Sequence, residues 1–147
     1  MQHPPRLPCL ALIVALGAAT GASAASTGEV EQGRALYAQH CAACHGADLE
    51  GAPDWQRPGP DGRYPAPPHD ETGHTWHHGD VMLLDYTRRG GQAYLDDLGV
   101  VFDSGMPAFG DILSDDEIRA ILAFIRSTWP EEIQAFQAAR TAAETAD

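Results

Sequence analysis

Apolar residues recur at helical spacing in three separate parts of the chain, which predicts three helices. The first covers residues 29–40. The second covers residues 81–88 and ends before a Gly-Gly pair, with Asp80 as its candidate N-cap. The third starts at Ser114, because Ser114 and Glu117 make a capping box ahead of a strongly apolar stripe. The stripe positions are Val30, Gly33, Leu36, Tyr37, His40, Val81, Leu84, Tyr86, Thr87, Ile118, Ile121, Leu122 and Ile125. Neither an internal repeat nor a strand-rich pattern accompanies them, so the chain is expected to be all-α.

Residues 46–74 break this helical pattern. They contain six prolines and five glycines, through which neither a helix nor a strand can run. A structureless stretch of this length is unusual inside a compact domain. It becomes reasonable if the loop wraps a large apolar cofactor that replaces part of the protein core.

Residues 1–24 are expected to be a signal peptide that is removed from the mature protein. Arg6 supplies a positive charge, a short apolar run follows, and Ala22-Ser23-Ala24 offers the small residues at which signal peptidase cuts. The apolar run is shorter than the roughly 20 residues that a spanning helix needs, although an uncleaved anchor is the alternative. Cleavage near Ala24 predicts an exported protein with no stable membrane insertion afterwards.

The third helix is expected to end at Trp129, because Pro130 follows and interrupts it. With the two acids that follow it, Pro130 can open a further helix through Gln137, after which an Ala-rich tail is expected to fray. The length left after cleavage is that of a single domain. We therefore divide the mature chain into one domain, residues 25–130, and a helical or frayed C-terminal extension, residues 131–147.

The mature chain is strongly acidic. Residues 1–24 contain one basic residue and no acid, so 8 basic residues remain against 21 Asp and Glu, a formal charge of −13. This balance repels nucleic acid and anionic membrane surfaces, and it favours protein partners with a basic docking surface. The acids could equally serve to keep an exported protein soluble, and the two explanations are compatible.

Residues 41–45, Cys-Ala-Ala-Cys-His, carry the most specific chemical signal in the chain. Two thiols three positions apart on one helical turn can each add to a vinyl group of a haem, and His45 then supplies an axial nitrogen to the iron. A dithiol redox motif, or a disulfide in an oxidising compartment, is the alternative. A thioredoxin-like site needs a βαβ context, which these helices and loops do not provide. The motif therefore predicts one covalently bound haem c, attached through Cys41 and Cys44.

The second axial ligand must come from another part of the mature chain, which contains two methionines. Met82 lies in the predicted helix beside an inner-face position, which favours a packing role. Met106 lies in a Gly-Met-Pro turn after a short apolar run at 100–102, and such a turn can direct a thioether at the iron. A sulfur opposite an imidazole stabilises the ferrous state and raises the reduction potential. Met106 is the expected ligand, and its competitors are His69, His74, His77 and His78.

From residue 30 to about residue 129 the chain resembles the class I c-type cytochromes of bacterial periplasms. The resemblance rests on the attachment motif, on the Gly-Met-Pro turn and on the two outer helices. It implies a cytochrome c fold, in which N- and C-terminal helices cross around one His/Met-ligated haem with long Pro/Gly-rich loops. The residues that it implies at the crossing are Gly33, Tyr37, Ile121 and Phe124.

The resemblance also implies two residues in the haem environment. Family members use a proline carbonyl after the attachment motif to accept a hydrogen bond from the second nitrogen of the axial histidine, which fixes its orientation. Pro67 or Pro68 is the counterpart in this chain. Trp76 looks like the tryptophan whose indole N–H binds a haem propionate in mitochondrial-type members, and a core aromatic is the alternative.

Residues 69–80 depart from the family because they contain four histidines and three acids. Three interpretations remain open. The cluster could bind copper or zinc, although its spacing matches no standard zinc motif. The histidines could instead hydrogen-bond the haem propionates and make the reduction potential pH-dependent. They could also be polar loop residues packed around the edge of the haem.

These features predict an exported one-electron carrier that works between redox protein partners. A haem with both axial positions filled keeps substrates away from the iron, and no convergent acid–base or nucleophile group appears, so no enzyme activity is expected. The alternatives are a haem subunit of an exported oxidoreductase and a copper-handling haem protein that uses the histidine loop. A peroxidase or gas-binding haem would require that Met106 does not bind the iron.

Overall fold

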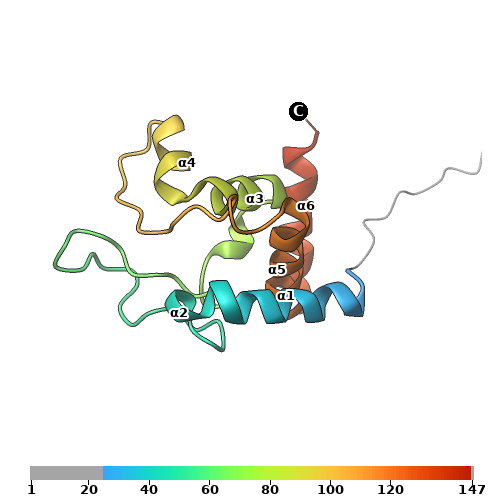
Figure 1. Cartoon of the computed structure of the whole chain (residues 1–147). Helices are drawn as coiled ribbons and strands as arrows, with labels where there is room; N and C mark the ends of the chain where they lie inside the picture. Colours follow the sequence, from blue (N-terminus) through green and yellow to red (C-terminus); the bar gives the residue numbers. More distant parts are fainter. Residues whose placement is uncertain (1–24, 147) are drawn as a thin grey trace, which may run out of the picture.

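The computed structural model describes residues 25–146, which form helices joined by long loops (Figure 1). No strand occurs among these residues, which confirms the all-α prediction. The helices are α1 (Thr27–His40), α2 (Ala42–His45), α3 (Asp80–Arg89), α4 (Gly91–Asp97), α5 (Asp115–Ser127) and α6 (Glu131–Glu144), with a 3₁₀ turn at Thr75–His77. The predicted signal peptide lies outside the described residues. No helix in the described part is both long enough and apolar enough to cross a membrane.

Helices α1 and α5 cross each other at Gly33 (Figure 1). A β-carbon at Gly33 would overlap the carbonyl group of Ala120 and would lie 3.0 Å from the Cβ of Phe124, so this close approach requires glycine. Beside it, the rings of Tyr37 and Phe124 meet edge to face with centroids 5.5 Å apart. The crossing implied by the family resemblance is confirmed, and Ile121 is buried in the same core.

Helix α5 supplies most of the buried core. Both bonds of its capping box form: the Ser114 hydroxyl accepts from the N–H of Glu117 at 3.3 Å, and the Glu117 carboxylate accepts from the N–H of Ser114 at 2.8 Å. The predicted helix start is therefore confirmed, and such a cap stabilises a helix by about 1 kcal/mol. The core cluster consists of Tyr37, Leu49, Leu113, Ile118, Ile121, Leu122, Phe124, Ile125 and Trp129.

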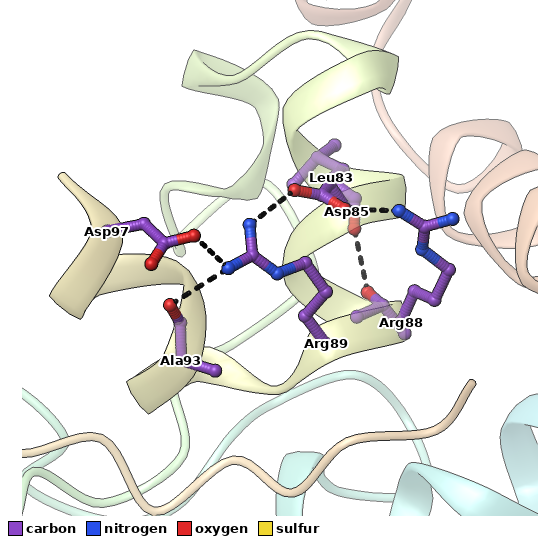
Figure 2. A network of polar contacts seen from close by, with 7 residues as sticks. Leu83, Asp85, Arg88, Arg89, Ala93 and Asp97 are labelled. Atoms are coloured by element: carbon purple, nitrogen blue, oxygen red, sulfur yellow. Dashed lines mark hydrogen bonds and ion pairs between the residues drawn. The ribbon is translucent and has the colours of Figure 1, made fainter. Parts of the chain in front are cut away.

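Helices α3 and α4 form a corner that is joined at Gly90. Gly90 has a φ of 82°, which ends α3, and α4 begins at the next residue. The sequence pattern does not predict α4, because a Gly-Gly pair is typical of a helix end. The guanidinium of Arg89 joins the two helices: it binds Asp85 of α3, and it also binds Asp97 and the carbonyl of Ala93 in α4 (Figure 2).

Helix α6 continues to Glu144, so of the two forms expected for the C-terminal extension, helical or frayed, the structure has the helical one. Its last turns cap α3. The Glu144 carboxylate accepts from the N–H of Gly79 at 3.1 Å and from the N–H of Val81 at 3.0 Å, and the Thr141 hydroxyl accepts from the N–H of Asp80 at 3.1 Å. The first amides of a helix have no partner inside it, and here a distant helix satisfies them. The N-cap of α3 is Gly79 rather than the predicted Asp80.

Residues 46–74 contain neither helix nor strand, as predicted. The end of this loop is nevertheless tied to the core. The N–H of His69 donates to the carbonyl of Leu49 at 2.8 Å, and the indole N–H of Trp129 donates to the carbonyl of His69 at 2.7 Å. Residues 67–69 therefore lie against the helical core, whereas the loop near residue 60 projects away from the helices (Figure 1).

Candidate functional site

The attachment motif consists of Cys41, which joins α1 to α2, and of α2 itself, residues 42–45. Cys41 ends α1, where its N–H donates to the carbonyl of Tyr37 at 2.9 Å, and the N–H of His45 donates to the carbonyl of Cys41 at 3.0 Å. Cys41 is half-buried, Cys44 is exposed, and neither thiol is in a disulfide. Burial, assisted by the neighbouring Cys44, raises the pKa of Cys41 to about 11. One helical turn therefore presents both thiols and the imidazole.

His45 is buried, with 8% of its surface exposed. Its Nδ1 lies 2.8 Å from the carbonyl oxygen of Pro67, so of the two candidate prolines it is Pro67 that makes this contact. Because a carbonyl can only accept, Nδ1 carries the proton, and Nε2 is the nitrogen left to bind a metal. Burial lowers the pKa of His45, and the bond to Pro67 opposes this shift. The direction favours the neutral imidazole, which is the form that binds metals.

A second imidazole covers one face of the His45 ring. The rings of His45 and His69 are stacked, with centroids 4.0 Å apart and 24° between their planes. Nδ1 of His69 lies 2.8 Å from the hydroxyl oxygen of Thr75, which is buried. Burial holds the pKa of His69 well below its usual value. The sequence pattern does not distinguish His69 from the other loop histidines. Its position directly after the Pro-Pro pair, which was expected to contact His45, is the one feature that could have indicated this contact.

Met106 lies in the loop between α4 and α5 and is half-buried. Its N–H donates to the Ser104 hydroxyl at 3.3 Å, and its carbonyl accepts from the N–H of Gly91 at 3.0 Å. Further along the same loop, the ring of Phe109 meets the ring of His40 edge to face, with centroids 6.5 Å apart. The loop that carries Met106 therefore connects the α3–α4 corner with the end of α1, next to the attachment turn.

Trp76 lies in the 3₁₀ turn before α3. Its indole N–H donates to the carbonyl of Glu71 at 3.3 Å, within the same loop. Its ring stacks on His77, with centroids 3.7 Å apart, and meets Phe136 of α6 edge to face at 5.5 Å. The propionate contact that the resemblance implies for Trp76 stays a prediction.

The other histidines of the loop, His74, His77 and His78, lie near one another. The ring centroid of His74 is 6.3 Å from that of His77 and 5.3 Å from that of His78. Burial, followed by the neighbouring histidines, lowers the pKa of His74 and of His78. Within residues 25–146, no group of three or more His, Cys, Asp or Glu side chains could hold a metal ion. The copper and zinc interpretations therefore have no built site in the described part of the chain.

The residues present at this site fit a covalently attached haem. The donor set is two thiols that are not in a disulfide and an imidazole whose Nδ1 is already bonded, which is what thioether attachment and axial ligation require. Helix α3 also has no fully buried residue, and two of its apolar side chains, Leu83 and Leu84, are partly buried against the core.

The comparison with known protein families agrees with this chemistry. The model of the family described as Cytochrome c matches residues 30–129. The match covers more than half of the chain and includes the attachment turn, Pro67 and Met106, whereas α6 lies beyond it. No curated protein and no solved structure matches the chain.

Proposed function

Because this chain belongs to the cytochrome c family, we propose that it is a class I, His/Met-ligated cytochrome of a bacterial periplasm that carries single electrons between redox protein partners. Family membership by itself implies haem-based electron transfer and a covalently bound haem c rather than a catalytic activity. The iron ligands, the compartment and the partners are inferred from the chain's own residues.

Cys41 and Cys44 would hold the haem through two thioether bonds, and His45 and Met106 would supply the two protein ligands of its iron. The observation that carries this assignment is the 2.8 Å contact between Nδ1 of His45 and the carbonyl of Pro67. It selects the tautomer in which Nε2 has the free lone pair, and it restrains the orientation of the ring.

Met106 is favoured over His69, His77 and His78 for geometrical reasons. His69 stacks on the face of His45, so it lies beside that ligand and not opposite it. His77 and His78 are tied to α6, because their carbonyls accept from Arg140 at 3.0 Å and from Gln137 at 3.2 Å. Met106 instead lies in a separate loop, where its N–H donates to the Ser104 hydroxyl and its carbonyl accepts from the N–H of Gly91.

The bound haem supplies a one-electron ferric–ferrous couple. The residues of this chain determine its surroundings: burial of His45 keeps water away from the ligand, and a thioether opposite an imidazole favours the ferrous state. Two filled axial positions prevent a substrate from reaching the iron, which suits a carrier.

The partners are proposed to be proteins with a basic docking surface. The chain has a formal charge of −12, and opposite charge on a partner steers the two proteins together. Export through the predicted signal peptide places the carrier in the periplasm. Association rates with a basic redox partner should fall steeply with ionic strength.

Replacing Met106 with Ala in the holoprotein tests the ligand assignment. We expect the variant to lose the weak methionine-to-iron charge-transfer band at the red end of the oxidised spectrum and to have a lower midpoint potential. The matched control is Met82→Ala, which should keep the band. A band that survives Met106→Ala, or that Met82→Ala removes, would show that Met106 is not the ligand.

A second candidate function is that of a dedicated haem subunit of an exported oxidoreductase. The supporting observation is the surface where α6 meets the histidine loop, because Phe136 is 46% exposed there and contacts both Trp76 and His77. A permanent partner would cover this ring. Purification from the native source under mild conditions separates the two candidates: a stable complex supports the subunit, and a free monomer supports the carrier.

A further inference from the structure

Residues 67–69 contact His45 in two different ways. In the plane of the ring, the Pro67 carbonyl accepts from Nδ1 at 2.8 Å. On the face of the ring, the His69 imidazole is stacked at 4.0 Å. A hydrogen bond to one nitrogen restrains the ring, but it tolerates a broad range of angles at the carbonyl oxygen and so leaves some freedom of tilt. The stacked ring removes this freedom, and the two contacts together define the plane of His45.

His69 is itself held at three points. Its N–H donates to the carbonyl of Leu49 at 2.8 Å, and its carbonyl accepts from the indole of Trp129 at 2.7 Å. Its side chain is held through Nδ1, which lies 2.8 Å from the hydroxyl of Thr75. Leu49 and Trp129 belong to the buried core, and Thr75 is only 8% exposed. The ring that stacks on His45 is therefore anchored to the rigid part of the protein at both its backbone and its side chain.

We propose that His69 is a positioning residue: anchored by Thr75, it fixes the plane of the His45 imidazole and so determines how that ligand is oriented on the iron. The inference rests on the proposed function through His45 alone and does not depend on Met106. The orientation of an axial imidazole plane affects the energies of the iron d orbitals, which the electron paramagnetic resonance spectrum of the ferric protein reports. A role in packing alone would leave this spectrum unchanged when an apolar side chain of similar size replaces His69.

The first test uses Thr75, because its replacements separate the hydroxyl from the shape of the side chain. Thr75→Val keeps the shape and removes the hydroxyl, and Thr75→Ser keeps the hydroxyl. We expect Thr75→Val to shift or broaden the largest g value of the ferric holoprotein, and Thr75→Ser to retain the wild-type spectrum. Thr72→Val is the matched control, since its hydroxyl bonds Asp70 in the exposed part of the same loop, and it should have no effect.

The second test replaces His69 itself. His69→Phe keeps a flat ring and loses the bond to Thr75, so its spectrum should resemble that of Thr75→Val. His69→Leu loses both the ring face and the bond, so it should give the largest shift in g value and a measurable shift in midpoint potential. If His69→Leu does not incorporate haem, the comparison of Thr75→Val with Thr75→Ser tests the positioning role by itself.

The outcomes separate this inference from the proposed function. A wild-type protein without a low-spin ferric signal would contradict His45 ligation as part of a six-coordinate haem. A low-spin wild type whose spectrum is unchanged by Thr75→Val and by His69→Leu would overturn the positioning role and leave the electron-carrier proposal intact. Equal shifts in Thr75→Val and Thr75→Ser would also overturn it, because the hydroxyl would then not matter.

Discussion

The attachment region, residues 27–69, and the methionine region, residues 80–110, carry the two proposed iron ligands but are stabilised in different ways. The attachment region contributes Tyr37 and Leu49 to the buried core and crosses α5 in close contact. No buried residue of the core cluster comes from the methionine region. His45 therefore belongs to a part of the protein that contributes fully buried residues to the core, whereas the region of Met106 contacts the core only through partly buried side chains, namely Leu83, Leu84 and Phe109.

Polar contacts hold the methionine region together. Arg89 joins α3 to α4 through Asp85 and Asp97, and the hydroxyl oxygens of Tyr86 and Ser104 lie 3.1 Å apart. Surface ion pairs of this kind contribute about 0–1 kcal/mol each. Several large apolar residues stay exposed here, namely Val81, Leu98, Val100, Val101 and Phe102. The difference teaches that contacts with the buried core orient His45, whereas mainly polar contacts near the surface hold the loop that carries Met106.

The largest expected effect comes from breaking the packing of the attachment region with Gly33→Ala. The new β-carbon would overlap the carbonyl of Ala120, so α1 and α5 must separate, and we expect a loss of about 3 kcal/mol or more in the free energy of unfolding. Gly28→Ala is the control, because Gly28 lies in the same helix with nothing within 4 Å. It should be neutral or stabilising by up to about 1 kcal/mol. Denaturant unfolding of the two holoprotein variants measures both effects. Equal free energies of unfolding for Gly33→Ala and Gly28→Ala would contradict the close crossing.

The next effect is a difference in local opening between the two regions. Amides of α3 and α4 should exchange with solvent about tenfold or more faster than those of α1 and α5, because they are covered by fewer buried apolar contacts. Native-state hydrogen exchange of the holoprotein measures this directly. Equal protection in all four helices would mean that the regions open as one unit and that the contrast drawn above is wrong.

A smaller effect is expected at the cap that α6 provides for α3. Glu144→Ala removes the acceptor for the N–H groups of Gly79 and Val81, and it should destabilise the protein by about 1 kcal/mol with faster exchange at the start of α3. Glu144→Gln keeps an acceptor oxygen and should cost less. If both variants match the wild type in exchange and in thermal unfolding, the Glu144 contacts do not stabilise α3.

The smallest effect is expected at the exposed apolar loop of the methionine region. Val101 is fully exposed, so Val101→Ser should change the free energy of unfolding by less than about 0.5 kcal/mol. The comparison is Ile118→Val in α5. Ile118 is 0% exposed, so this substitution should lower the free energy of unfolding by about 1 kcal/mol. A Val101→Ser variant that unfolds as easily as Ile118→Val would show that the loop packs against the protein in solution.

Local sequence was sufficient for the features whose partners lie within a few residues. The capping box joins Ser114 to Glu117, three positions away, and both of its bonds form in the structure. The turn of residues 41–45 is equally local, so its chemistry can be read from the order of its side chains. The absence of helix and strand from residues 46–74 follows from their prolines and glycines, which act on their own backbone.

Only the tertiary structure decided which distant residues complete the site. His45 and Pro67 are 22 positions apart, across a loop without periodicity, so no spacing rule distinguishes Pro67 from its neighbour. The stacking of His69 on His45 and the capping of α3 by Glu144, 65 positions after Gly79, are equally non-local. The partner of a buried ring or of an unpaired helix amide is the group that lies next to it once the core has packed. Packing of the core depends on the whole chain, so local sequence does not reveal the partner.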